Sequence, residues 1–341
     1  MRRFGRLRAV DLPDRPRALP GLPLLKRHRD VVQIGVDGRH AVIVEQLPPP
    51  LVEALLGLRG RHTLAELRAR LPHHADDLVG VLRGLVEAGL VDETVPQDGR
   101  LTAETTAWAL RTRRSARHVP EARAKRCVAV RGDGRLAVAV AAQLAAAGVG
   151  FVRVRAEGRV GAEDTGCGYL DADVGRPRAE AAADAVRRAR ETVRRGSGAP
   201  DLVILTDALA YGPEVAWPLM KARTPHLVVR AREGLGVVGP LVVPGRSSCL
   251  RCADLHKGDV DDGWPMIAAQ LADLPQHADL ATTTATAGCA VAQALQALDH
   301  GDAAIARPPT WDATLEVDAF AGSVLHRIAP VHPRCDCRSL A

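Results

Sequence analysis

The chain has 341 residues, a formal net charge of +6 and 47% apolar residues, with only 3% aromatic. This length allows two domains, and the apolar content allows a core built from alanine, leucine and valine. The arginines are dispersed, so nucleic acid is not an expected partner. Residues 1–8 lead into no apolar segment, and the most apolar stretch, residues 136–152, is too short to cross a membrane. We therefore expect a cytoplasmic protein with no signal peptide and no membrane span.

A hairpin is predicted near the start of the chain. Residues 1–20 are rich in arginine and proline, and we expect them to be flexible. Residues 25–36 and 40–47 have strand-like composition and flank Asp37-Gly38, a dipeptide typical of hairpin turns. The sequence therefore predicts two antiparallel strands with a turn at residues 37 and 38.

Three helices are predicted after this hairpin. Three prolines precede a helix over residues 51–58, because proline is well tolerated in a first turn. Thr63 and Glu66 have the spacing of a capping box, which opens a second helix. Residues 76–88 carry leucines on one face and are followed by Gly89, a residue typical of helix C-caps, before a short return strand. Residues 21–95 therefore predict a winged-helix domain.

Residues 96–125 are polar and predict a linker with one helix around Trp108. Beyond it, strands and helices alternate. The predicted strands cover residues 127–130, 151–154, 202–205 and 226–230, and the predicted helices cover residues 136–147, 176–195 and 213–222. Such alternation is typical of a doubly wound parallel sheet with helices on both faces. Residues 126–341 are thus expected to form a Rossmann-like α/β domain.

Four cysteines lie in two close pairs, Cys249 with Cys252 and Cys335 with Cys337. Two thiolates on a short loop can occupy two corners of a tetrahedron, and two such loops complete a closed four-sulfur zinc site. Disulfides are the alternative, but the chain has seven cysteines, an odd number, and no secretory signal, which favours a reducing compartment. A closed site has no position for water, so we expect a structural Zn²⁺. His332 could replace one of the four ligands.

A glycine-rich turn separates the first strand of the α/β domain from its first helix. Gly132, Asp133 and Gly134 occupy the place of a phosphate-binding loop, where backbone N–H groups at a helix start can face an anion. Asp133 would repel such an anion, and the next strand ends without the carboxylate that holds a ribose, unless Glu157 supplies it. The alternative is that this loop only turns the chain.

With these motifs, residues 126–341 resemble the ThiF/MoeB family of ubiquitin-activating-enzyme-like adenylyltransferases. Gly132 and Gly134 match the nucleotide loop, Asp207 matches the strand end that places a magnesium-binding aspartate, and the four cysteines match the zinc ligands. The family's catalytic lysine position is Arg178, which cannot replace a lysine over phosphates. The asparagine after the aspartate is Ala208. The resemblance therefore implies a degenerate nucleotide site, in which use of ATP and Mg²⁺ is doubtful.

The fusion of a winged-helix domain to such a domain is similar to TOMM precursor leader-peptide-binding proteins, the cyclodehydratase partners with a PqqD-like recognition element. This resemblance implies a leader-binding scaffold for azole-forming, bacteriocin-type peptide maturation, a separate YcaO-type cyclodehydratase as partner, and a homodimer. A leader could add as a strand to an exposed sheet edge. The candidate edge is Ala41, Val42, Ile43 and Val44, and the candidate wall is Leu78, Leu82 and Leu85, which could instead be core.

Two other functions compete with this scaffold hypothesis. The chain could be a working ThiF-type adenylyltransferase that activates the C-terminal carboxylate of a carrier protein or peptide. It could also be a DNA-binding regulator that uses its winged helix. The third predicted helix carries Asp76, Asp77 and Glu87 against Arg83 alone, which is unfavourable for phosphate contacts.

Overall fold

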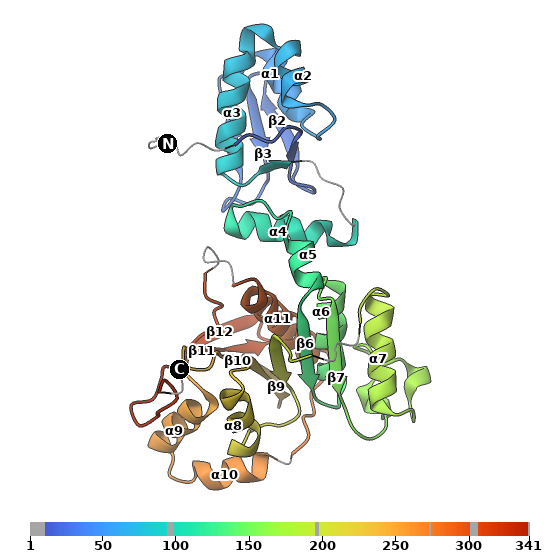
Figure 1. Cartoon of the computed structure of the whole chain (residues 1–341), viewed down its shortest axis with the longest axis vertical. Helices are drawn as coiled ribbons and strands as arrows, with labels where there is room; N and C mark the ends of the chain where they lie inside the picture. The colour runs from blue at the N-terminus through green and yellow to red at the C-terminus, as the bar shows by residue number, and fades with distance from the viewer. Residues whose placement is uncertain (1–10, 94–98, 195–197, 273, 301–305, 340–341) are drawn as a thin grey trace. The chain divides into compact units, whose positions relative to one another are not determined.

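The computed structural model describes residues 11–93, 99–194, 198–272, 274–300 and 306–339. It divides into two compact units, Met1–Pro120 and Glu121–Ala341, which are described separately below (Figure 1). The division falls within the segment that the sequence predicts as a linker.

The N-terminal unit contains a three-stranded antiparallel sheet. Its strands are β2 (Leu24–His28), β3 (Val31–Ile34) and β4 (Val42–Val44), in the order β2-β3-β4. The predicted strand over residues 25–36 is wrong, because the chain turns at Arg29-Asp30 and forms two strands there. The Asp30 side chain lies within hydrogen-bond distance of His28 across this turn, 3.1 Å. The second turn, after β3, carries the expected Asp37-Gly38.

Three helices cover the unit's core: α1 (Pro49–Leu56), α2 (Leu64–Arg70) and α3 (Ala75–Glu87). The predicted capping box is confirmed, since Thr63 Oγ1 accepts from the Glu66 N–H (3.1 Å) and Glu66 accepts from the Thr63 N–H (2.9 Å). Gly89 follows α3 with a left-handed φ of 72°, the conformation of a glycine cap. The core is mostly aliphatic and includes Val32, Ile34, Leu51, Val52, Leu55, Leu78, Leu82, Leu85 and Leu90.

Segments at both ends of this unit are also ordered. Strand β5 (Val91–Glu93) pairs antiparallel with β1 (Pro16–Ala18). The expectation that residues 1–20 are flexible is therefore wrong for residues 16–18, while residues 1–10 lie outside the described residues. Two helices follow, α4 (Thr102–Thr112) and α5 (Val119–Ala124). Helix α4 packs the indole of Trp108 into the interior, where it is 2% exposed, so this part of the predicted linker is folded.

The C-terminal unit is built on a seven-stranded mixed sheet, with strand order β12-β11-β10-β9-β8-β6-β7. The strands are β6 (Cys127–Arg131), β7 (Phe151–Arg155), β8 (Leu202–Leu205), β9 (His226–Arg232), β10 (Leu235–Val242), β11 (Ala313–Asp318) and β12 (Ser323–Ile328). Strands β7, β6, β8 and β9 are parallel, as predicted. Strands β10, β11 and β12 extend the sheet as an antiparallel meander, which the sequence analysis did not predict.

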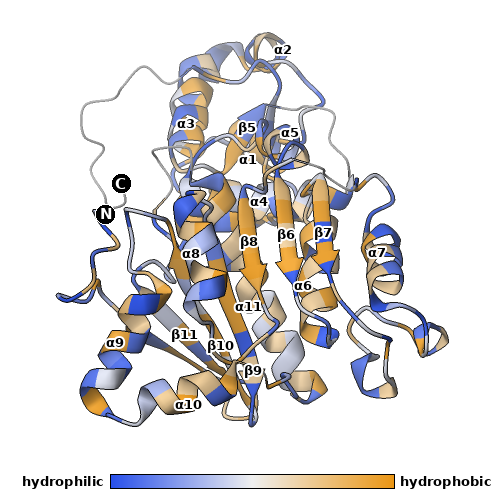
Figure 2. Ribbon diagram, turned by 60° about the horizontal axis from the view of Figure 1, so that its bottom comes forward, coloured by the Kyte–Doolittle hydropathy of each residue, from blue (hydrophilic) through white to orange (hydrophobic). Residues whose placement is uncertain are grey.

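Helices cover both faces of this sheet (Figure 2). One face packs against α6 (Arg135–Ala146) and α11 (Leu280–Asp299), with α7 (Arg178–Ala189) beside α6. The other face packs against α8 (Pro213–Lys221) and α9 (Leu250–Val260), and α10 (Trp264–Leu271) contacts α9. Figure 2 shows β8 as apolar and β6 as apolar up to its last residue, Arg131, as expected for strands that are buried on both faces. The edge strand β7 is more polar and carries Arg153 and Arg155.

Short 3₁₀ turns complete the described secondary structure, at Pro72–His74, Gly99–Leu101, Ala162–Asp164 and Asp171–Asp173. Within the described residues, no helix is both long enough and apolar enough to cross a membrane.

Candidate functional site

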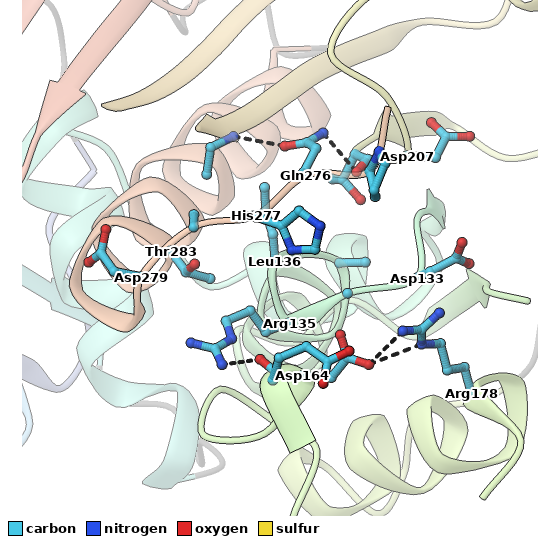
Figure 3. Close-up of a pocket in the computed structure, with 17 residues that line it drawn as sticks. Asp133, Arg135, Leu136, Asp164, Arg178, Asp207, Gln276, His277, Asp279 and Thr283 are labelled. Atoms are coloured by element: carbon cyan, nitrogen blue, oxygen red, sulfur yellow. Dashed lines mark hydrogen bonds and ion pairs between the residues drawn. The ribbon is translucent and has the colours of Figure 1, made fainter. Parts of the chain in front are cut away.

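A cavity of about 400 Å³ lies at the carboxyl ends of β6 and β8, and we name it the β6–β8 pocket (Figure 3). Ligands of open α/β sheets bind at this edge, outside the ends of the parallel strands. The pocket's walls come from the loop before α6, the start of α7, the end of β8 and the segment that leads into α11. It includes Gly134, Arg178 and Asp207, three of the four residues that the sequence assigned to the nucleotide site, and not Gly132.

The glycine-rich loop has the predicted place between β6 and α6. Gly132 has a left-handed φ of 149°, and a Cβ there would collide with the Thr206 side chain at the end of β8. Gly134 is the N-cap of α6. Asp133 accepts a hydrogen bond from the Glu157 N–H (2.7 Å) and lines the pocket. The loop is thus folded tightly against β8, and it brings a carboxylate to the place of the expected anion.

Arg178 reaches the pocket from the first turn of α7, but its charge is already paired. Its Nε and Nη2 donate to Asp164 Oδ2 at 3.1 and 2.7 Å, and the Asp164 side chain is only 8% exposed. Burial would lower the pKa of Arg178, but the Asp164 carboxylate more than offsets this effect, so the pKa is raised. The Asp164 carboxylate already binds the guanidinium of Arg178, so this group is not available to a phosphate that enters the pocket.

Asp207 ends β8, as predicted, and it also has a partner of opposite charge. Its Oδ2 lies 2.9 Å from Nη2 of Arg131, the last residue of β6. The other oxygen, Oδ1, is buried and has no hydrogen-bond partner among the described residues. One oxygen of Asp207 is therefore neutralised inside the protein, and the other is buried without a hydrogen-bond partner among the described residues.

The balance of charge in the β6–β8 pocket is acidic. Its lining includes five carboxylates and two arginines, and these are Asp133, Glu163, Asp164, Asp207 and Asp279 against Arg135 and Arg178. Arg135 donates to the main-chain oxygen of Glu163. Because like charges repel strongly in a partly buried site, this lining opposes binding of a triphosphate.

The sequence analysis did not single out Gln276, which lines the pocket next to His277. Nε2 of Gln276 donates to the main-chain oxygen of Thr206 (2.8 Å), and its Oε1 accepts from the Ala231 N–H (2.8 Å). The amide thereby ties the segment before α11 to the ends of β8 and β9. His277 follows it and directs its ring into the pocket (Figure 3). No sequence motif identifies this glutamine, because its hydrogen-bond partners Ala231 and Thr206 lie 45 and 70 residues away in the chain.

The four predicted cysteines converge on one point. The Sγ atoms of Cys249, Cys252, Cys335 and Cys337 all lie within 4.8 Å of one another. Three of the sulfur–sulfur distances are 3.6 to 3.7 Å. A tetrahedral zinc site with bonds of about 2.3 Å would place its sulfurs about 3.8 Å apart, so the donor set fits this metal.

His332 is not part of this cluster. Its Nε2 lies 2.7 Å from Asp259 Oδ2, and its Nδ1 is 3.1 Å from the Arg334 N–H. The four cysteines alone could therefore hold the metal. Because Cys249 caps the start of α9 and Cys252 lies in its first turn, a metal here would fix α9 to the C-terminal segment.

The residues predicted to bind a peptide are split between surface and core. Val42, Ile43 and Val44 form β4, an edge strand of its sheet, and Ala41 directly precedes it. Ile43 is 45% exposed. Leu78, Leu82 and Leu85 are buried in the unit's own core, the alternative that the sequence left open, so they present no surface to a ligand.

No protein-family model and no curated protein sequence matches this chain. Solved structures do share its fold. E. coli MccB with AMPCPP and MccA has a TM-score of 0.74 and 12% identity, covering 95% of this chain and 99% of that one. The same protein with ATP gives a TM-score of 0.72 at 13% identity, with 94% and 99% covered. PaaA gives 0.66 at 16% identity, with 91% and 98% covered.

These matches establish the fold, and they support the ThiF-like fold expected from the sequence. MccB is a microcin C7 biosynthetic enzyme that has also been solved with N-formylated MccA. The coverage extends over nearly the whole chain, so the match includes residues of both units.

Proposed function

We propose that this protein binds the leader of a ribosomally made precursor peptide and presents the peptide to a separate YcaO-type cyclodehydratase. In this proposal the N-terminal unit is a winged-helix recognition element and the C-terminal unit is a zinc-stabilised scaffold that does not use ATP. The observation that carries it is the internal pairing in the β6–β8 pocket, where Arg178 and Asp207 are each engaged by a residue of opposite charge. We expect the protein to act as a homodimer.

The N-terminal unit supports peptide binding because β4 leaves one side of its sheet unpaired. An extended peptide can complete such an edge with main-chain hydrogen bonds, and its alternate side chains then contact the sheet. An exposed apolar side chain such as Ile43 favours peptide binding, because the bound peptide would shield it from water. Helix α3 begins with Asp76 and Asp77, which makes it unfavourable for phosphate contacts and argues against DNA as the ligand.

The experiment is a titration of a labelled leader from a candidate precursor peptide, with Ile43→Asp as the test variant. The new charge on β4 should weaken binding by about tenfold or more, since a buried unpaired carboxylate costs over 1.4 kcal/mol. Val36→Asp is the matched control, because Val36 is 69% exposed and lies outside the strands. Equal losses in the two variants, or leader binding unaffected by Ile43→Asp, would contradict the assignment of β4.

One observation favours the second candidate, an ATP-dependent adenylyltransferase acting on a carboxylate. Asp207 Oδ1 has no hydrogen-bond partner among the described residues, and MccB, which has the same fold, has been solved with ATP. Calorimetric titration of ATP and Mg²⁺ into the zinc-loaded protein separates the two functions. The scaffold predicts no saturable binding, whereas micromolar binding that disappears in Asp207→Ala would establish the adenylyltransferase in its place.

A further inference from the structure

A groove of about 490 Å³ lies along β7, the outermost strand at one edge of the C-terminal sheet (Figure 2), and we name it the β7 groove. Helix α7 supplies its other wall. Its floor is aliphatic and consists of Val152, Val154, Ala179, Ala183, Val186 and Val193. The groove therefore places apolar surface beside the edge of a sheet.

The outer edge of β7 is paired only at its start. The Val152 N–H donates to the main-chain oxygen of Arg194 (3.3 Å), and the Arg194 N–H donates to that of Gly150 (2.9 Å). Successive residues of a strand direct their main-chain groups to opposite sides, so Val154, like Val152, directs its N–H and C=O away from β6. No described strand pairs with Val154 on that side. An extended peptide can therefore continue the sheet there.

The charged side chains that line the β7 groove are all basic, as far as the structure describes it. They are Arg153, Arg155, Arg187 and Arg194. Arg187 is bonded to Asp184, one turn earlier on α7. Arg155 and Arg194 are exposed, and neither forms an ion pair with a described residue. The lining itself therefore supplies a positive charge, and two of its cations are available to a ligand.

The two faces of β7 differ in chemistry, and this difference specifies the ligand. Val152 and Val154 pack toward the cores that contain α6 and α7. Side chains alternate along a strand, so Arg153 and Arg155 project from the opposite face. On a strand added beside β7, residues of one face would contact the valines and residues of the other face would lie beside the arginines. A complementary strand therefore alternates apolar and acidic residues.

We propose that the β7 groove binds an extended segment of a partner protein in which acidic and apolar residues alternate, and that this segment adds to β7 as a further strand. A nucleic acid strand would also be attracted by the arginines, but it would gain nothing from the aliphatic floor or from the main-chain groups of Val154. The interaction goes beyond the proposed function, because leader binding at β4 belongs to the N-terminal unit.

The test is a ligand-observed NMR titration of the full-length, zinc-loaded protein with acetyl-Val-Glu-Val-Glu-Val amide and acetyl-Val-Gln-Val-Gln-Val amide. We expect the glutamate peptide to bind about fivefold more tightly at low salt, since each exposed ion pair contributes only modestly. The double variant Arg155→Gln/Arg194→Gln should abolish this preference. Lys221→Gln/Arg223→Gln is the matched control and should preserve it, because it removes two exposed cations of the same unit that do not line the groove.

A third peptide, acetyl-Val-Val-Val-Glu-Glu amide, has the same composition without the alternation, and it should bind no better than the glutamine peptide. Ile43→Asp should retain the preference for the alternating glutamate peptide, so failure at β4 and failure at β7 are observed separately. Thermal unfolding of each variant identifies any loss that comes from misfolding.

Four outcomes would overturn the inference. The first is equal affinity for the glutamate and glutamine peptides, and the second is a preference that survives in Arg155→Gln/Arg194→Gln. The third is a preference that the control double variant removes to the same extent, which would show a general effect of net charge. The fourth is a short oligothymidylate that binds more tightly than the glutamate peptide and loses affinity in Arg155→Gln/Arg194→Gln, which would make this a nucleic-acid site.

Discussion

The cations of the C-terminal unit are neutralised to different degrees. In the β6–β8 pocket, Arg178 is bonded to Asp164 at 2.7 Å, and Arg131 beside it is bonded to Asp207 at 2.9 Å. Arg230 on β9 and Lys257 on α9 have no such partner among the described residues. The first two cations are thus neutralised by carboxylates of the protein, and the second two are not.

The difference shows how a pocket can retain its shape while its ligand class changes. A fold can place a cavity at the ends of β6 and β8 whether or not anything binds there, because helix packing defines it. What changes is the charge inside. Carboxylates that pair with the cations remove the reason for an anion to enter, whereas unpaired cations supply that reason.

The largest effect should come from removing the metal ligand Cys252. Cys252→Ala should destabilise the C-terminal unit by about 4 kcal/mol or more, because binding of a structural metal contributes directly to folding free energy. Urea unfolding and bound zinc per chain are the measurements. Cys289→Ala, at a half-buried cysteine outside the cluster, is the control, and equal behaviour of the two variants would show that no metal holds α9.

The next effect separates the paired cation from the unpaired one. Arg178→Met leaves Asp164 buried without its partner, so unfolding free energy should fall by about 2–3 kcal/mol, allowing for the Gly161 N–H that Asp164 keeps. Arg230→Met removes an unsatisfied charge, and it should leave stability unchanged or raise it. Urea unfolding of both variants is the measurement.

The double variant Arg178→Met/Asp164→Leu provides the control for this pair. It removes both charges and should recover most of the lost stability. If Arg230→Met proves as destabilising as Arg178→Met, then Arg230 has a stabilising role within the fold, and the contrast between the two arginines disappears.

Much of the fold could be predicted from local pattern. Leu202–Leu205 begins and ends where expected, and α3 and α6 lie within a residue of their predicted bounds, because apolar periodicity and capping residues act locally. The turn at Arg29-Asp30 was missed, since strand-like residues continue on both sides of it. The antiparallel strands β10–β12 were missed because they lack the intervening helices that mark parallel strands.

The site was predictable only in part. The four cysteines and Asp207 carry their chemistry in residue type and spacing, and the structure brings the cysteines together. The pairing of Arg178 with Asp164 is not visible in the sequence, because it depends on the path of the loop over residues 156–177. Arg230 was not singled out either. One arginine among many gains significance only when its neighbours fail to neutralise it.

The pairing of β1 with β5 has a consequence for how such proteins are assembled. Residues 16–18 and residues 91–93 are hydrogen-bonded neighbours, although more than seventy positions separate them. The chain therefore enters and leaves this part of the molecule at nearly the same point. A segment closed in this way can be inserted into another chain or exchanged for a variant with little disturbance to its host. This module is accordingly transferable, so it can be replaced while the α/β unit stays as it is.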